Sequence, residues 1–330
     1  MSIFDQKVIK YEMKPLSSLE KVFPDETPVY RMECQMLSGL WGETVSFQVA
    51  YTGDFVMRER LDVRVVSELA EHVHVRTVEM VPVGRATNGI VDDNYLKTTS
   101  GLYPDLLKDL KDGKVIVYSR QWRSLWVDVD ITNEIPAGEY EIELQLIKEG
   151  EVVCSAKQKV TVIGTELPKL DIMHTEWMHA DCLADYYHVE VFSEEHWKLL
   201  ENYFQEYVKR DCNMMLTPLF TSPLDTAIGL ERTTCQLIDV EVKDGEYVFG
   251  FEKLKRWIDL CKKCGIEYFE MSHLFSQWGA KYAPKVVATV NGKKEKIFGW
   301  HTPAVGEYTK FLESFLPQLT AKLRKWEIAD

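Results

Sequence analysis

The first half of the chain alternates apolar and polar residues with a period of two. Apolar residues occupy every second position of VSFQVAY, SLWVDVDI and GEYEIELQL. This period is typical of antiparallel strands with one face in a core and the other in water. Many short strands with turn residues between them predict a β-sandwich over residues 1–165. One helical insert is predicted within it, at YPDLLKDL, residues 103–110.

In the second half the pattern changes to strands that alternate with helices. SEEHWKLLENYFQEYVKR has apolar residues at helical spacing, Ser193 as an N-cap and basic residues at its end. FEKLKRWIDLCKKCG is a second predicted helix, which Gly265 ends. Parallel strands are predicted near residues 169–175, 212–217 and 266–271.

A third helix and two hairpins complete the pattern of the second half. Thr302 is the predicted N-cap of the helix, Pro303 lies in its first turn, and Pro317 predicts a kink or break. Asp-Gly and Asn-Gly pairs within the long loops predict tight hairpin turns. These pairs are Asp244-Gly245 and Asn291-Gly292.

The alternation of strands and helices, with elaborate loops after the strands, is typical of a (β/α)₈ barrel. A doubly wound sheet shares the alternation, but its first turn would usually carry a Gly-rich phosphate loop, which this sequence lacks. The sequence therefore predicts two domains. Residues 1–165 form an antiparallel β-sandwich, and residues 166–330 form the first three β/α units of an incomplete (β/α)₈ TIM barrel.

Charge and aromatic content narrow the function. The formal net charge of −13 argues against nucleic acid as a partner, because its phosphates would be repelled. Aromatic residues make up 12% of the chain, and nine of them are Trp. One explanation of this aromatic content is large cores. A more specific explanation is sugar binding, because Trp rings stack on the apolar faces of pyranose rings.

Cysteine usage and the lack of long apolar segments predict a cytoplasmic protein. The N-terminus has no apolar signal segment, and no stretch approaches the roughly 20 apolar residues of a membrane span. The seven Cys are scattered, and an odd count suits reduced thiols. Cys261 and Cys264 form the only close pair, and we expect it to lie on a helix rather than to bind metal. We therefore expect no metal, no cofactor and no membrane partner.

Polar and aromatic side chains gather where each of the three predicted strands ends. The carboxyl ends of neighbouring parallel strands meet at one face, so these side chains are predicted to converge. Carboxylates, His and Gln hydrogen-bond hydroxyls well and Trp supplies a platform, a combination that suits a carbohydrate. The clusters are His174, Glu176, Trp177, His179 and Asp181; Thr217, Phe220, Thr221, Asp225 and Arg232; and Glu270, His273, Gln277 and Trp278.

Structural roles are the alternative for each of these residues. Asp225 and Arg232 pairing with each other is one such role, Glu176 capping a turn is another, and Trp177 and Trp278 covering the core is a third. A His/Glu/Asp metal centre is also conceivable, although no HExxH or similar spacing supports it. The occurrence of three clusters in register favours the binding site.

Long segments of the chain resemble glycoside hydrolase family 123 and its bacterial relatives. WMHADCLADYYHVEVFSEEHWKLLENY, NMMLTPLFTSPLDTAIGLERTTCQL and YFEMSHLFSQWGAKYAPKV resemble its catalytic domain. LWGETVSFQVAY, NYLKTTSGLYPDLL and QWRSLWVDVDI resemble the β-sandwich that precedes that domain. The resemblance implies a (β/α)₈ barrel and hydrolysis of β-linked N-acetylgalactosamine by a retaining, substrate-assisted mechanism. The acetamido oxygen of the substrate attacks the anomeric carbon, an Asp orients that amide, and the adjacent Glu protonates the leaving oxygen.

The sequence departs from the family pattern at this catalytic pair. Asp25-Glu26 lies in the sandwich half, and the second half contains no Asp-Glu dipeptide. We therefore expect a fragment or a truncated chain that is inactive as a glycosidase by itself. One alternative is a non-catalytic carbohydrate-binding protein. Another is an enzyme in which Glu270 is the acid, with Asp225 or Asp181 as its partner.

The expected partner is a carbohydrate, with self-association as a second expectation. Three β/α units cannot close a barrel, so an open sheet edge is predicted, together with an exposed apolar patch at Phe311, Phe315 and Leu319. In the loop after the third strand, the side chains of His273 and Gln277 would hydrogen-bond a sugar that Trp278 stacks against. The candidate substrate-binding residues are Trp177, His179, Asp181, Asp225, Arg232, Glu270, His273, Gln277 and Trp278.

Overall fold

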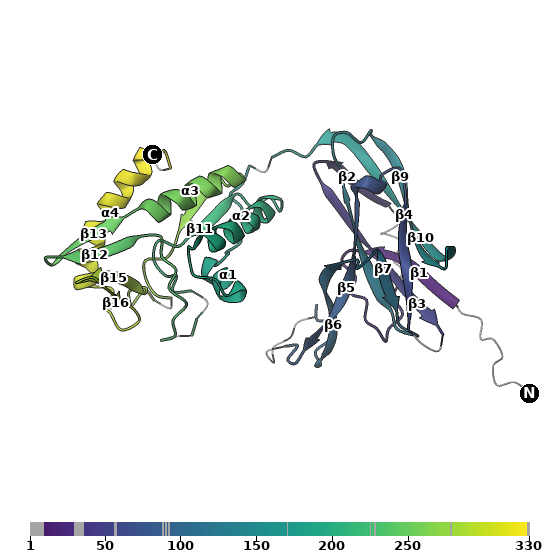
Figure 1. The fold of residues 1–330 in the computed structure, drawn as a ribbon, viewed down its shortest axis with the longest axis horizontal. Coiled ribbons are helices and arrows are strands. Elements are labelled where there is room, and N and C mark those ends of the chain that lie inside the picture. The colour runs from purple at the N-terminus through teal and green to yellow at the C-terminus, as the bar shows by residue number, and fades with distance from the viewer. Residues whose placement is uncertain are drawn as a thin grey trace, which may run out of the picture. The chain divides into compact units, whose positions relative to one another are not determined.

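The structure is a computed structural model, and it describes residues 10–29, 36–55, 58–87, 89, 91, 93–169, 171–224, 226–227, 229–277 and 279–328. The chain divides into two compact units, Met1–Lys169 and Leu170–Asp330. Figure 1 colours the first unit from purple to teal and the second from teal to yellow. Within the described ranges, no helix is both long enough and apolar enough to span a membrane.

The first unit consists of two five-stranded sheets with a shared core. Its strands are β1 (Lys10–Ser17), β2 (Met36–Trp41), β3 (Thr44–Asp54), β4 (Glu59–Val66), β5 (Val73–Val83), β6 (Gly101–Asp109), β7 (Lys114–Val117), β8 (Arg123–Asp130), β9 (Gly138–Lys148) and β10 (Glu151–Glu166), with a 3₁₀ turn at Ala70–His72. The strand orders are β1-β3-β8-β5-β6 and β2-β10-β9-β4-β7. Buried apolar side chains from both sheets form one cluster between them. The predicted period-two pattern therefore corresponds to strands of a β-sandwich.

The prediction of a helix at residues 103–110 is wrong. Residues 103–109 belong to β6, which pairs antiparallel with β5 and lies at the edge of its sheet. Pro104 lacks the N–H that a helix interior needs, whereas an edge strand tolerates that loss. Hydrogen bonds to β5 satisfy the backbone instead, with a register shift between Glu79 and Met80.

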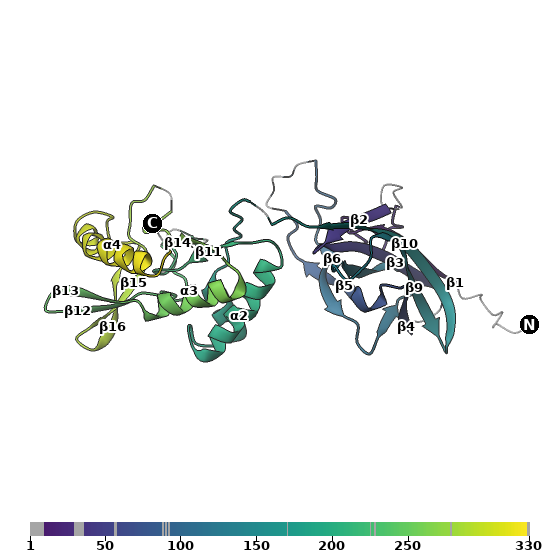
Figure 2. The same ribbon diagram turned by 90° about the horizontal axis from the view of Figure 1, so that it is seen from above.

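The second unit combines helices with two small sheets. Its elements are α1 (Ala180–Tyr187), α2 (Glu194–Val208), β11 (Met214–Thr217), β12 (Asp239–Lys243), β13 (Glu246–Gly250), α3 (Glu252–Cys264), β14 (Tyr268–Met271), β15 (Val286–Val290), β16 (Lys293–Phe298) and α4 (Glu307–Lys325). As predicted, Ser193 caps α2 by accepting from the N–H of His196, and Gly265 ends α3 at φ 103°. Helices α2 and α3 lie side by side in Figure 1 and Figure 2. Cys261 of the close Cys pair is fully buried on α3.

Strands β11 and β14 pair in parallel, with Leu216 opposite Glu270 and Thr217 opposite Met271. Helix α3 lies between them in the chain, so two of the three predicted strands are present and adjacent. Their carboxyl ends lie at one edge of this small sheet. The side chains that follow the two strands are therefore brought to the same side of the unit.

The strand predicted at residues 169–175 is absent from the described part of that segment, residues 171–175. The hydroxyl of Tyr207 lies between this segment and β11. Its oxygen is 2.8 Å from the backbone nitrogen of Glu176, 3.0 Å from the Glu176 carbonyl oxygen and 2.7 Å from the Met214 carbonyl oxygen. A side chain thus takes up backbone groups that a continuous strand ladder would have paired with each other.

The two predicted hairpins are confirmed. Asp244 and Gly245 have φ of 51° and 85°, and Asn291 and Gly292 have φ of 50° and 79°. Positive φ at both central residues is the requirement of a type I′ turn. The hairpins β12–β13 and β15–β16 then join through parallel pairing of β12 with β15, which creates one four-stranded sheet. Nothing local in the sequence indicates this union.

Helix α4 begins later than predicted, at Glu307 with Gly306 as its N-cap residue. The segment around Pro303 pairs with another loop instead. The N–H of Ala283 donates to the carbonyl of Thr302 at 2.9 Å, and the N–H of Ala304 donates to the carbonyl of Lys281 at 3.0 Å. Two cross-loop hydrogen bonds thus outweigh the local capping signal.

Of the kink or break predicted at Pro317, the break does not occur, and the prediction of exposed side chains on α4 is wrong. The helix runs through Pro317, which lies on its exposed side, so water can serve the carbonyl that loses its partner. Phe311 and Phe315 are fully buried and Leu319 is 6% exposed. They are covered because the aromatic face of the four-stranded sheet packs against α4. Phe249 lies 5.4 Å from Phe311 and 5.1 Å from Phe315 between ring centroids.

Candidate functional site

One group of predicted residues meets at the carboxyl end of β14. The indole Nε1 of Trp177 donates a hydrogen bond to Oε2 of Glu270 at 2.9 Å. The ring of Trp177 also meets the ring of His273 edge-on, at 5.5 Å between centroids and 78° between planes. Trp177 is 47% exposed and His273 is exposed as well. These three side chains therefore form a polar and aromatic surface that a ligand can reach.

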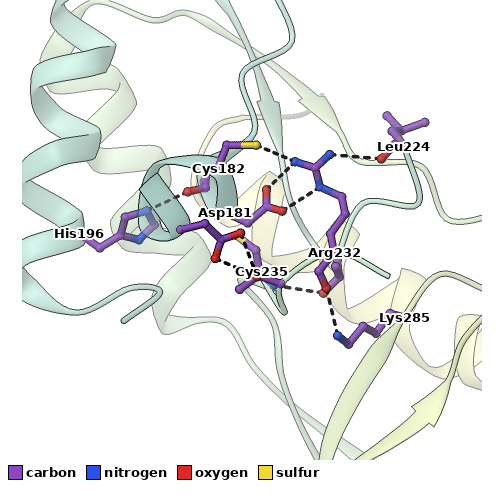
Figure 3. Close-up of polar contacts among 11 residues, drawn as sticks. Asp181, Cys182, His196, Leu224, Arg232, Cys235 and Lys285 are labelled. Atoms are coloured by element: carbon purple, nitrogen blue, oxygen red, sulfur yellow. Dashed lines mark hydrogen bonds and ion pairs between the residues drawn. The ribbon is translucent and has the colours of Figure 1, made fainter. Parts of the chain in front are cut away.

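A second group is a buried ion pair between Asp181 of α1 and Arg232 of the loop before β12. The guanidinium of Arg232 donates two hydrogen bonds to the carboxylate of Asp181, from Nε to Oδ2 at 2.8 Å and from Nη2 to Oδ1 at 3.0 Å (Figure 3). The two side chains are 10% and 8% exposed. A bidentate pair of this kind fixes both position and orientation. Because both carboxylate oxygens are engaged and little exposed, the pair holds the loop at Arg232 against α1.

Further contacts fix the same arginine. Nη1 of Arg232 donates to the carbonyl of Leu224 at 3.3 Å, Nη2 lies 3.0 Å from Sγ of Cys182, and the carbonyl of Arg232 accepts from Nζ of Lys285 at 3.1 Å (Figure 3). Burial alone would lower the pKa of the guanidinium, but the Asp181 carboxylate outweighs it and raises that pKa. Arg232 therefore stays charged and ties α1, the loop before β12 and the start of β15 together.

His196 supports α1 from the other side. Its Nδ1 accepts from the N–H of Phe192 at 2.9 Å, so its Nε2 carries the proton that is donated to the carbonyl of Ala180, also at 2.9 Å. Burial lowers the pKa of this imidazole, against the opposing effects of the Ala180 carbonyl and Asp181. A neutral His196 thus fixes the first residue of α1, next to Asp181.

A pH dependence of stability follows from His196. Its pKa is lower in the folded state than the value of about 6.5 expected for an unfolded chain. Its contribution is therefore complete above about pH 6.5 and is lost as pH falls below that value, by no more than about 1.4 kcal/mol per pH unit. Urea unfolding at pH 7.5, 6.5 and 5.5 measures this slope. The His196→Gln variant should flatten it, whereas His301→Gln, at an exposed position, should not. Equal slopes in all three proteins would contradict this role.

The other candidate site residues do not join either of these two groups. His179 is the N-cap residue of α1, and Gln277 is partly buried in the loop after β14. Phe220 is 1% exposed and packs against Phe311 and Phe315, so it is a core residue. Asp225 and Trp278 lie outside the described residues. Three other members of the clusters hydrogen-bond the backbone. The hydroxyl of Thr221 accepts from the N–H of Cys235, and the hydroxyl of Thr217 donates to the carbonyl of Met215. The Nδ1 atom of His174 lies 3.1 Å from the carbonyl oxygen of Asp211.

Sequence reasoning missed several polar groups around this site. Thr233 donates from its hydroxyl to the carboxylate of Asp185 at 2.9 Å, which links α1 to the loop a second time. Glu231 pairs with Lys296 at 2.6 Å and with Lys285 at 3.5 Å. The partners are far apart in the chain, so no spacing signal could have revealed them. Within the described ranges, no group of three or more His, Cys, Asp or Glu is arranged to hold a metal ion.

Comparison with known proteins identifies the second unit. Residues 177–330 match the family model of the glycoside hydrolase 123 catalytic domain. A solved family 123 glycoside hydrolase from Clostridium perfringens, described for glycolipid glycan hydrolysis, shares the fold with a TM-score of 0.71 and 13% identity, over 97% of this chain and 57% of that one. A β-glucosidase from Listeria innocua covers 48% of this chain and 17% of its own, at 10% identity and a TM-score of 0.23, too low to bear on the fold. No curated protein sequence matches the chain.

The second unit is therefore a glycoside hydrolase-like domain, in which polar and aromatic residues gather at the carboxyl end of the two-stranded parallel sheet of β11 and β14. Residues 177–330 belong to the family of glycoside hydrolase 123 catalytic domains, as the sequence resemblance implied. The chain spans 57% of the length of the Clostridium perfringens enzyme chain that it matches.

Proposed function

We propose that this chain is part of a glycoside hydrolase-like protein that acts on glycans with β-linked N-acetylhexosamine, N-acetylgalactosamine in particular. The match of residues 177–330 to the family 123 catalytic domain carries this proposal. We further propose that β11 and β14 are neighbouring strands of a (β/α)₈ barrel. Their parallel pairing and the helix between them support that assignment.

Trp177, Glu270 and His273 are the proposed sugar-facing residues. The Trp177 indole offers a flat apolar surface, and its hydrogen bond to Glu270 restrains the ring. One oxygen of Glu270 accepts from the indole, which leaves the other able to accept from a sugar hydroxyl. Asp181 and Arg232 are proposed to position α1 and the loop before β12, because both are buried and engaged with each other.

In a substrate-assisted mechanism the acetamido oxygen of the sugar is the nucleophile, so the protein need not supply one. The residues of this chain would bind the ring and hold it against the Trp177 surface. An Asp to orient the amide and an adjacent Glu to protonate the leaving oxygen are also required by that mechanism. Residues 177–330 contain no Asp-Glu dipeptide, so we propose that the 330-residue chain binds sugar without turning it over. A non-catalytic carbohydrate-binding protein is the second candidate for the same reason.

Calorimetry with a β-linked N-acetylgalactosamine disaccharide tests the site. The Trp177→Ala variant should bind about 10-fold more weakly than the unchanged chain, a loss of about 1.4 kcal/mol. Tyr186→Ala is the matched control, because Tyr186 is an aromatic residue on α1 that is 76% exposed. Equal weakening by both variants, or no binding by the unchanged chain, would contradict the proposed site. Release of the aryl group from an aryl β-N-acetylgalactosaminide by this chain would show that its catalytic residues are already present.

A further inference from the structure

The first unit contains a cleft of about 740 Å³, whereas the proposed sugar-facing residues all belong to the second unit. Residues of β5, β6 and β8 line it from one sheet, and residues of β4 and β7 line it from the other. Strands β6 and β7 are the edge strands of their sheets, so the cleft lies along the open side of the sandwich. Its size falls within the range of about 300–1,000 Å³ that is usual for small-ligand sites.

The cleft is basic in a chain whose net charge is −13. Two acidic residues, Glu79 and Asp109, lie among its lining residues. Six basic residues line it: Arg58, Arg60, Lys108, Lys111, Lys114 and Arg123. A local excess of positive charge against an acidic background attracts anions to this one place.

Only some of this positive charge is neutralised within the protein. Arg60 pairs with Asp112 at 2.8 Å, and Lys114 pairs with Asp62 at 3.2 Å. For Arg58, Lys108 and Lys111, the described part of the chain provides no ion pair. These three side chains are exposed, so their charges are available to a ligand.

Arg123 stands out within the cleft. Its guanidinium carbon lies 5.0 Å from the centre of the Tyr118 ring, and Nη2 donates to Oε1 of Gln121 at 3.0 Å. Its Nε is buried and has no hydrogen-bond partner within the described residues. Buried donors are rarely left unpaired, and each such group calls for an explanation. An anionic oxygen of a ligand in the cleft would accept a hydrogen bond from this Nε–H.

We propose that this cleft binds an acidic oligosaccharide, one that carries sulfate or carboxylate groups. Arg123 would bind the anionic group, and Lys108 and Lys111 would bind neighbouring charges along the chain of sugars. Tyr118, held under Arg123, offers an aromatic surface for a sugar ring. A nucleic acid is the competing polyanion, but proteins bind single-stranded nucleic acid through aromatic side chains on which successive bases stack, and Tyr118 is the one partly exposed aromatic side chain among the lining residues.

Binding of defined hexasaccharides to the full chain tests this proposal. Chondroitin sulfate carries sulfate and carboxylate, hyaluronan carries carboxylate alone, and chitohexaose is neutral. We expect either or both acidic hexasaccharides to bind, at least 10-fold more tightly than chitohexaose, with an affinity that falls as salt is raised. Hyaluronan binding would assign recognition to carboxylate, and binding of chondroitin sulfate alone would assign it to sulfate.

Two variants and a charge-matched control locate the site. Lys108→Gln/Lys111→Gln and Arg123→Gln should each weaken binding at least 10-fold. Lys159→Gln/Lys262→Gln removes the same charge as the double variant from exposed positions outside the cleft and should leave affinity within 2-fold. Binding of chitohexaose or of a six-nucleotide DNA strand as tightly as the acidic sugars would overturn the proposal. So would failure of both acidic sugars to bind, or equal weakening by the control.

Discussion

Replacing Arg232 with Met is expected to destabilise the second unit by about 3–5 kcal/mol. The substitution removes the partner of Asp181, whose side chain is 8% exposed and accepts two hydrogen bonds from the guanidinium. A buried carboxylate left without its counter-charge keeps the cost of desolvation and loses the attraction that offset it. Denaturant unfolding followed by circular dichroism measures the change in the free energy of unfolding.

Two further proteins make that measurement specific. Lys296→Met removes an ion pair with Glu231 in which Lys296 is 46% exposed, so a loss below about 1 kcal/mol is expected. The double variant Asp181→Asn/Arg232→Met removes both charges and should recover part of the loss, because no uncompensated charge remains. A loss for Arg232→Met no larger than that for Lys296→Met would show that the pair does not hold α1 and its neighbouring loop.

Replacing Phe315 with Ala is expected to cost about 3–5 kcal/mol. The side chain is fully buried and lies 5.0 Å from Phe220 and 5.1 Å from Phe249, measured between ring centroids. Its removal leaves a cavity where α4 meets the four-stranded sheet. The same unfolding measurement applies.

The neighbouring residue provides the control for Phe315. Leu316 is 40% exposed on the other side of the same helix, so Leu316→Ala should cost less than about 1 kcal/mol. If Phe315 did not pack against Phe220 and Phe249, the two substitutions would cost about the same. Similar losses would therefore contradict the packing of α4 described above.

Features with a local cause were predictable from the sequence. The Asp244-Gly245 and Asn291-Gly292 turns need positive φ at two consecutive residues, and few other dipeptides supply it. Ser193 and Gly265 likewise mark helix ends through their own side chain or its absence. The meeting of Trp177 with Glu270 was predicted from their positions after two predicted strands, although residues 171–175 form no strand and Trp177 reaches Glu270 from an irregular segment.

Features that depend on distant partners were not predictable in the same way. Tyr207 lies near the end of α2, and nothing in its spacing reveals that its hydroxyl contacts the backbone of Glu176 and Met214. Asp181 and Arg232 belong to separate predicted clusters, and their pairing depends on how α1 packs. The burial of Phe311 required a sheet that forms only when two hairpins join. Each outcome is set by a tertiary contact that overrides a local preference.

The order of elements along the chain has a consequence for folding during synthesis. Both hairpins leave the ribosome before α4. Phe249 and Phe298 of these hairpins pack against Phe311, which lies on that helix. At typical rates of synthesis of about 5–20 residues per second, the aromatic faces of the hairpins stay exposed for a few seconds. During that interval the nascent second unit exposes aromatic surface to which chaperones bind, and the synthesis of α4 covers that surface.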